Sequence, residues 1–350
     1  MEFRKDPLTG NWVTFAPERA SRPFEYTVSP AADRLDSCPF CRGREALTPD
    51  AVLQLDKTAS PSDDWSVRVI PNRYPAFTSS AAGVSGQSST VAGFPQRQDS
   101  DVESGVVDFE SSPGAGRHEV LIESPEHCSS MSAIDAAQFH LIVNCYQQRL
   151  LSFKNDQRLA HAVIFKNQGA AAGASLTHVH SQIVATPFVP KTIDEELDAA
   201  VRFRKDAAPH SGSLWSALLV RELRAATRIV NESESFVVLC PFASRFPYET
   251  WLIPKRHDPE FTNVTCDELR EFSEQLRNTL TALERTLPVP AFNFALCVAP
   301  FRDVRSEAYH WHLKVTPRIA GIAGFELGTG SWINIVLPEH AAAALRSAWS

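Results

Sequence analysis

Two His-x-His pairs, at residues 178–180 and 310–312, are the segments of this sequence with the clearest chemical potential. Alternate residues of a β-strand face the same side, so a strand through the first pair would place His178, His180 and Gln182 in one row. A neutral imidazole, with a pKa of about 6.5, is a competent nucleophile near neutral pH without a separate base. Such a pair alone is more often structural or metal-binding, so the residues around it must show whether it is catalytic.

A glycine-containing loop, residues 167–175, comes directly before the first pair. Gly169 and Gly173 would let backbone N–H groups approach an anion closely, which predicts a phosphate held over a histidine. The amide of Gln182 can donate a hydrogen bond to a phosphoryl oxygen but cannot give up a proton at pH 7. A glutamine at this position favours transfer between phosphates over hydrolysis of phosphoramidates. The alternative is a glutamine that is merely exposed on a strand.

The C-P-F-C motif of Cys38 and Cys41 is the second chemical signal. The seven cysteines are odd in number and scattered, which argues against a disulfide framework. Two thiolates at this spacing can share one Zn²⁺, whose remaining ligands must come from elsewhere in the chain. A redox-active C-x-x-C motif is the alternative.

The elements that would position these residues occur twice in the same order. Residues 116–127 resemble residues 245–257, and each segment is followed by a helical pattern, a short apolar strand and a His-x-His strand. This self-similarity predicts a duplicated α+β unit, with residues 1–190 and 191–350 as its halves and a boundary near Pro190. Chance similarity is the alternative.

The expected elements follow from hydrophobic periodicity and from turn residues. Helices are predicted at residues 133–153 and 266–287, strands at 162–165, 177–186 and 292–298, shorter strands within 53–69 and at 120–123, and a long loop at 79–104.

Composition excludes several classes of protein. With 350 residues the chain is long enough for two domains and a sizeable core. Its 34 basic and 41 acidic side chains give a net charge of −7, which argues against non-specific nucleic-acid binding. No apolar run approaches the ~18 residues of a membrane span, and charged residues crowd the start where a signal peptide would be apolar. We therefore expect a cytoplasmic protein with no membrane or nucleic-acid partner.

Several sequence blocks, in a fixed order along nearly the whole chain, resemble the galactose-1-phosphate uridylyltransferase branch of the histidine-triad superfamily. The blocks are D-P-L-T-G-N-W-V, P-E-R-A-S-R-P, C-P-F-C, I-P-N-R-Y-P, S-P-E-H, N-Q-G-A-A-A-G-A-S-L-T-H-V-H-S-Q and G-F-E-L-G-T-G-S-W-I-N. The resemblance implies an α+β fold of two antiparallel-sheet halves with packed helices. It also implies a ping-pong reaction in which His180 attacks the α-phosphorus of UDP-glucose and holds the uridylyl group. Glucose 1-phosphate then leaves, galactose 1-phosphate enters and UDP-galactose forms.

The resemblance also assigns roles to individual positions and implies a homodimer. Gln182 acts beside His180, and the zinc ligands are Cys38, Cys41, His127 and His178, with Cys128 as an alternative to His127. The substrate contacts are Arg19, Arg22, Asn72, Asn167, Gly173, Ser175, Phe325 and Glu326. A second metal, Zn²⁺ or Fe²⁺, would use Glu196, Cys297, His310 and His312, unless the two histidines only pack against the sheet.

Three departures from the family pattern keep other functions open. Val179 replaces a proline between the histidines, which restores a backbone donor and should spare the strand alternation. Arg73 stands where some relatives carry an acid near the ribose, so the base and ribose specificity is open. The segment G-T-G-S-W resembles ADP-glucose phosphorylases as much as uridylyltransferases. The first alternative is therefore a nucleotide-sugar phosphorylase that uses inorganic phosphate as acceptor. The second is a non-catalytic, zinc-containing nucleotide-binding protein.

Overall fold

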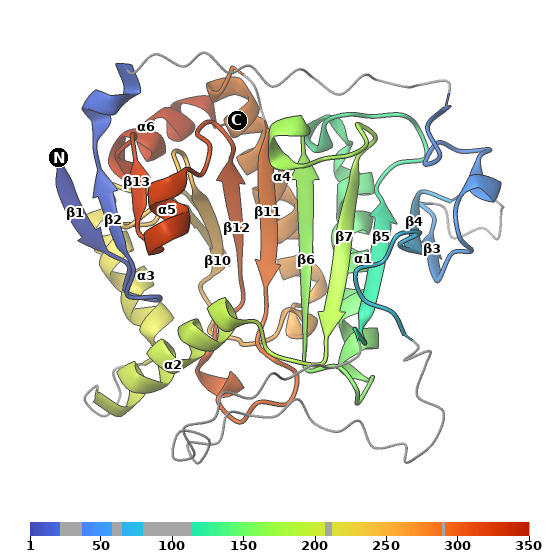
Figure 1. The fold of residues 1–350 in the computed structure, drawn as a ribbon, viewed down its shortest axis with the longest axis horizontal. Helices are drawn as coiled ribbons and strands as arrows, with labels where there is room; N and C mark the ends of the chain where they lie inside the picture. Colours follow the sequence, from blue (N-terminus) through green and yellow to red (C-terminus); the bar gives the residue numbers. More distant parts are fainter. Residues whose placement is uncertain (22–36, 58–64, 80–113, 207–211, 289–290, 350) are drawn as a thin grey trace.

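The computed structural model describes residues 1–21, 37–57, 65–79, 114–206, 212–288 and 291–349, and within them the chain forms a mixed α+β fold (Figure 1). A ten-stranded, wholly antiparallel sheet runs across the molecule. Its strands, in spatial order, are β3 (Leu53–Leu55), β4 (Val67–Pro71), β5 (Arg117–Ile122), β7 (His180–Thr186), β6 (His161–Gln168), β11 (Phe292–Cys297), β12 (His312–Pro317), β10 (Thr250–Pro254), β9 (Phe236–Leu239) and β8 (Ile229–Glu232). The predicted α+β class with an antiparallel sheet is confirmed.

A smaller sheet and the helices complete the fold. The smaller sheet contains β1 (Glu2–Lys5), β2 (Trp12–Phe15) and β13 (Trp332–Asn334), with β2 and β13 parallel. The helices are α1 (Ala136–Lys154), α2 (Lys191–Asp206), α3 (Leu214–Ala225), α4 (Cys266–Thr286), α5 (Gly324–Thr329) and α6 (Pro338–Ala348). None of the helices in the described ranges combines the length and the apolar character that crossing a bilayer requires.

The strand order of the large sheet repeats itself. The order β5–β7–β6 is mirrored by β10–β12–β11, and the two sets join where β6 pairs with β11. The chain passes from one set to the other between β7 and α2, where Pro190 lies. We propose residues 1–190 and 191–350 as the duplicated halves, although the first strands, β1 and β2, pair with β13 near the end of the chain.

The principal helices lie behind the sheet in Figure 1, where α1 and α4 are packed side by side. In α1 the Asp135 side chain accepts a hydrogen bond from the Gln138 backbone N–H, which caps the helix start. Apolar residues at three- and four-residue spacing, including Phe139, Val143 and Tyr146, are buried against the sheet. The predicted helices at 133–153 and 266–287 correspond to α1 and α4.

The opposite face of the central strands is more open. Val163, Phe165 and Asn167 of β6 are only half buried, whereas the intervening residues are buried. In β7, Gln182 and Val184 are half buried on the same side. Because side chains alternate along a strand, this open face carries the residues available to a ligand.

Several element boundaries differ from the sequence prediction. The segment 53–69 forms two strands, β3 and β4, and residues 80–104 of the predicted long loop lie outside the described residues. The strand predicted from residue 177 begins only at His180. The reason is that the Val179 N–H donates to the Cys128 carbonyl, outside the sheet, although the Val179 carbonyl still accepts from Glu123 N–H in the β5–β7 register.

Acid sensitivity is expected from the buried His161 at the start of β6. Its Nε2 lies 3.1 Å from the Val298 carbonyl oxygen, and burial lowers the pKa of His161 to about 4. As pH falls from about 6.5 to 4, only the unfolded chain binds this proton, so stability is lost in that window. We expect a loss of about 2 kcal/mol at pH 5 from this residue. Urea unfolding of wild type and His161→Gln between pH 7 and 5 measures it, and parallel pH dependences would contradict it.

Candidate active site and metal centre

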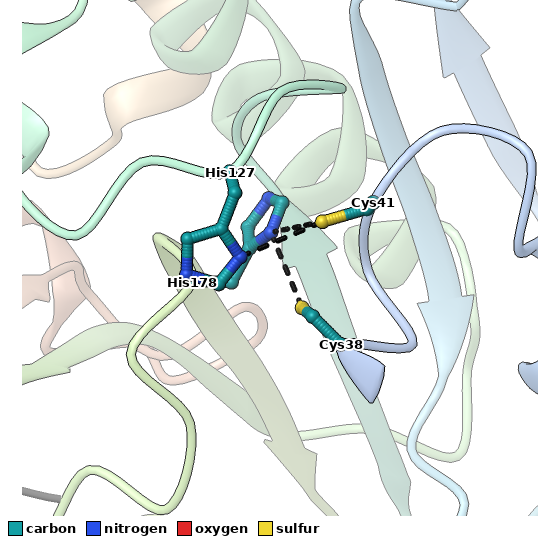
Figure 2. Close-up of side chains that lie close together, drawn as sticks. All are labelled: Cys38, Cys41, His127 and His178. Carbon is teal, nitrogen blue, oxygen red and sulfur yellow. Dashed lines mark hydrogen bonds between the residues drawn. The ribbon is translucent and has the colours of Figure 1, made fainter. Parts of the chain in front are cut away.

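Cys38, Cys41, His127 and His178 converge beside the start of β7 (Figure 2). The Sγ atom of Cys38 lies 3.4 Å from His178 Nδ1, and that of Cys41 lies 3.5 Å from His127 Nδ1 and 3.6 Å from His178 Nδ1. Tetrahedral Zn²⁺ with ordinary bond lengths separates a sulfur and a nitrogen ligand by about 3.6 Å. The four ligand atoms all lie within 4.8 Å of one another, so the group fits one tetrahedral ion.

The protonation of this group also suits a metal. His178 Nε2 lies 2.9 Å from the Ser124 carbonyl oxygen, which fixes the proton on Nε2 and leaves the Nδ1 lone pair toward the cysteines. Burial lowers the pKa of His178 to about 4, which keeps the ring neutral. Burial, followed by the neighbouring Cys38, raises the pKa of Cys41 to about 11. These two adjacent thiols therefore need a cation between them in order to ionise.

Cys128, the alternative ligand, lies outside this group. Its thiol donates a hydrogen bond to the Ser130 carbonyl at 3.0 Å. The structure thus assembles the set with His127.

His180 is buried at the first position of β7, with 7% of its surface exposed. Its Nδ1 lies 2.8 Å from the His178 carbonyl oxygen, so Nδ1 carries the proton and Nε2 keeps its lone pair. Burial lowers the pKa of His180, which favours the neutral, nucleophilic ring. The ring of Phe40, between the two cysteines, packs edge-on at 5.4 Å. The metal group and the nucleophile candidate are therefore one packed unit.

A buried charge pair that sequence reasoning missed lies behind this nucleophile. Lys166 Nζ donates to Glu123 Oε2 at 2.5 Å and to the His180 carbonyl at 3.0 Å. Glu123 also accepts from the hydroxyls of Ser181 and Tyr146. Both charged side chains are essentially inaccessible to solvent. The network holds the backbone of the strand at His180, and its signal in the sequence was a charged residue within each of two apolar segments.

His118 of β5 is a second residue that the sequence did not reveal. The backbone N–H of Ala76 donates to its Nδ1 at 3.2 Å, so the proton lies on Nε2 and is donated to Gln182 Oε1 at 2.8 Å. The amide NH₂ of Gln182 is then left free to donate, as the prediction for this residue requires. Asn72, a predicted nucleotide contact, lies against the same ring, with its Nδ2 3.0 Å from His118 Nε2; with the proton on Nε2 both of these atoms are donors, so Gln182 and not Asn72 is the hydrogen-bond partner of Nε2 in this tautomer.

The loop between β6 and β7 contains the remaining predicted contacts of the first half. Gly173 has a φ of +82°, a left-handed conformation that favours glycine, and Ser175 is exposed. Gly169 has the same φ, and a Cβ there would lie 2.9 Å from the Cβ of Ala291. Asn167, at the end of β6, faces the open side of the sheet.

The structure does not bring Arg19, Phe325 and Glu326 to His180 within one chain. Arg19 lies in a short helical turn after β2, and the other two lie in α5, which contacts β13 and lies to the left of β12 in Figure 1. Two strands, β6 and β11, separate β12 from β7. Arg22 lies outside the described residues.

The second predicted metal set is not assembled. Although all four residues are described, no three of Glu196, Cys297, His310 and His312 have ligand atoms within 4.8 Å of one another. The physical reason is that Glu196 already pairs with a cation, the ammonium of Lys314, and accepts a hydrogen bond from the Tyr309 hydroxyl at 2.8 Å.

The two histidines of that set bond to the backbone instead. His310 Nε2 lies 2.8 Å from the Pro254 carbonyl oxygen, and His312 Nδ1 lies 2.9 Å from the His310 carbonyl oxygen. His312 therefore repeats the backbone arrangement of His180. Its Nε2, however, is buried without a hydrogen-bond partner in the described part of the chain, and the ring packs on Trp215 at 4.3 Å. His312 thus has the same Nδ1 contact to the backbone as His180, but its Nε2 is buried and cannot reach a ligand.

Comparisons with known proteins agree with this site. A family model described as the N-terminal domain of galactose-1-phosphate uridyl transferase matches residues 1–190, and a domain of unknown function matches residues 126–348. ADP-glucose phosphorylase of Arabidopsis thaliana is 34% identical over 99% of this chain and 92% of that protein. Galactose-1-phosphate uridylyltransferase of Thermotoga maritima is 28% identical over 99% and 98%, respectively.

Solved structures of proteins with these same two activities resemble this chain over nearly its whole length. An ADP-glucose phosphorylase from Arabidopsis thaliana with bound ADP-glucose superposes with a TM-score of 0.78 at 31% identity, covering 99% of this chain and 98% of that one. A uridylyltransferase structure superposes with a TM-score of 0.71 at 27% identity and the same coverage.

The similarity to galactose-1-phosphate uridylyltransferases and to a nucleotide-sugar phosphorylase, together with the mirrored sheet and the histidine at the start of β7, identifies the protein as a nucleotidyltransferase. More particularly, the chain belongs to the galactose-1-phosphate uridyl transferase family.

Proposed function

We propose that this protein transfers a nucleotidyl group from a nucleoside diphosphate sugar to a phosphate-bearing acceptor through His180. In the first step Nε2 attacks the α-phosphorus, the bond from that phosphorus to the bridging oxygen breaks, and a sugar 1-phosphate leaves with the electron pair. In the second step an acceptor phosphate oxygen attacks the same phosphorus and the P–N bond breaks, which restores the neutral imidazole. The observation that carries this proposal is the hydrogen bond from His180 Nδ1 to the His178 carbonyl, which leaves Nε2 as the nucleophilic nitrogen.

The proposal assigns a role to each group around that ring. Gln182, oriented by His118, would donate to a phosphoryl oxygen in the transition state. Asn72, Asn167, Gly173 and Ser175 would contact the nucleotide and its phosphates. A sugar phosphate is already a stable anion, so its departure needs no general acid at position 182.

We also propose a structural Zn²⁺ bound by Cys38, Cys41, His127 and His178. Two thiolates and two neutral imidazoles neutralise the ion and leave no open position for water. The ion would fix the loop that contains Cys38 onto the strand that presents His180, without taking part in a reaction step.

A homodimer would explain the residues that lie far from His180. Arg19, Phe325 and Glu326 resemble family residues that contact the diphosphate and the hexose, but Arg19 and α5 lie across the sheet from β7. We propose that they reach the site of a second copy, where arginine would neutralise the diphosphate. All seven cysteines are free thiols, consistent with a reducing, cytoplasmic location.

Two donor–acceptor pairs share the His180 half-reaction. The first is UDP-glucose with galactose 1-phosphate, as the family implies. The second is ADP-glucose with inorganic phosphate. The second candidate has a specific observation in its favour: both identity and TM-score are higher for the Arabidopsis ADP-glucose phosphorylase than for the uridylyltransferases named above.

An assay of all four combinations of these donors and acceptors tests the proposal. We expect rapid turnover with one donor and exchange of labelled sugar 1-phosphate into that donor without any second acceptor, as a ping-pong reaction requires. Galactose 1-phosphate as the better acceptor would establish the uridylyltransferase, and inorganic phosphate the phosphorylase. Tight binding of donor with no exchange would instead establish the non-catalytic nucleotide-binding protein and overturn the proposal.

A further inference from the structure

Two residues of the second half, Asn293 and Arg318, reach into the site of the first. Asn293 Nδ2 donates to Asn167 Oδ1 at 2.7 Å and to the Ala172 carbonyl, in the glycine loop, at 2.9 Å. Arg318 follows β12, and its Nε donates to Asn293 Oδ1. This gives a chain of hydrogen bonds from Arg318 through Asn293 to Asn167, which crosses the seam between β11 and β6.

The direction of donation along these hydrogen bonds is fixed at the Arg318 end. A guanidinium can only donate hydrogen bonds, so Asn293 must turn its oxygen toward Arg318 and its NH₂ toward Asn167. Asn167 must then turn its oxygen toward Asn293. Its own NH₂ group is left without a hydrogen-bond partner among the described residues, on the open face of the sheet.

The free NH₂ group of Asn167 lies on a strand that neighbours the strand of the proposed nucleophile. The β6–β7 pairing ends with Phe165 opposite Gln182, so Asn167 and His180 each lie two residues beyond this pair, at the same end of two neighbouring strands. The NH₂ of Gln182, which is oriented separately by His118, likewise has no hydrogen-bond partner within the described ranges. Asn167 and Gln182 thus place two amides, both set as donors, at the His180 end of these two strands, an arrangement that suits the oxygens of a phosphoryl group and disfavours hydrogen-bond donors.

We propose that Arg318 is a positioning residue that acts through Asn293 to hold the Asn167 amide as a donor toward a phosphoryl oxygen of the nucleotide sugar. The inference rests on the proposed function for the identity of the ligand. Arg318 forms no ion pair within the described part of the chain; its guanidinium packs over the Phe246 ring at 5.1 Å. No carboxylate of the described residues therefore neutralises the charge of Arg318.

The decisive substitution is Asn293→Asp. Aspartate still accepts from Arg318 but cannot donate, so Asn167 must turn its NH₂ inward and its oxygen toward the ligand. In a His180→Ala background, which prevents turnover, we expect the dissociation constants of ADP-glucose and UDP-glucose, measured by calorimetry, to rise about 10- to 100-fold for whichever of them binds. Arg318→Gln, which can present either polarity, should lose part of this affinity, and Arg318→Lys, which can only donate, should restore most of that loss.

A double-mutant cycle separates this role from general electrostatics. With Asn167→Ala already present, Asn293→Asp should add less than a twofold effect if it acts through Asn167. An undiminished effect in that background, affinity within twofold of the parent for Asn293→Asp alone, or equal losses for Arg318→Lys and Arg318→Gln would each overturn the inference. Thermal unfolding of every variant checks the fold. Because binding is measured without turnover, failure of the proposed chemistry appears separately, as absence of a covalent adduct in the wild-type protein.

Discussion

Replacement of His180 by alanine should abolish both nucleotidyl transfer and formation of a covalent adduct. The wild-type protein incubated with its donor and no acceptor should gain one nucleotidyl group by intact-mass spectrometry. His180→Ala should gain none, and its turnover should fall by at least about 10⁴-fold, because the variant lacks the imidazole nitrogen that forms the P–N bond. Binding of the donor should largely persist, since the phosphate and nucleotide contacts come from other residues.

His312→Gln is the matched control for this result. His312 occupies the corresponding position of the second half, with the same Nδ1 contact to a carbonyl oxygen two residues before it, but its Nε2 is enclosed beside Trp215. We expect this variant, once shown to be folded, to form the adduct normally. Normal turnover of the donor by His180→Ala would overturn the proposed mechanism.

Loss of one zinc ion and of much of the stability is the expected result of Cys38→Ser. The remaining cysteine and two histidines would bind zinc far more weakly, and the free energy of unfolding should fall by about 3 kcal/mol or more, because metal binding contributes directly to folding. Elemental analysis of the purified protein and chemical unfolding measure the two effects. Transfer activity should fall as well, since the loop carrying Cys38 packs on His180 through Phe40.

Cys128→Ser provides the comparison for that experiment. Cys128 neighbours His127 in the chain, but its thiol bonds to the Ser130 carbonyl and lies outside the metal group. This variant should keep its zinc and nearly all of its stability. Full zinc content in Cys38→Ser would contradict the ligand assignment.

The parts of the site that the sequence predicted are those carried by short motifs. The C-x-x-C pair and the His-x-His strand each have a chemical meaning in themselves, and the structure brings Cys38, Cys41, His127 and His178 together. Helix positions followed from apolar periodicity, and the repeated order of elements anticipated the mirrored sheet. In each case the information lies within a few turns or strands of the chain.

Other features depended on pairings between distant segments. His118 meets Gln182 only because β5 lies beside β7, and Asn293 meets Asn167 only because β11 lies beside β6. The second predicted metal set is not assembled because Glu196 pairs with Lys314. This ion pair joins β12 to α2, which are distant in the sequence, so no local pattern indicates it. The start of β7 at His180 likewise depends on the Val179 contact with Cys128. Local patterns do not determine such partners.

The pairing of β6 with β11 determines how fragments of this chain should behave. Each strand saturates the backbone N–H and C=O groups along one edge of its neighbour. A fragment cut near Pro190 would expose that edge, and an uncovered edge recruits further strands. We therefore expect each such fragment to aggregate more readily than the intact chain, in which β6 and β11 cover each other's edge.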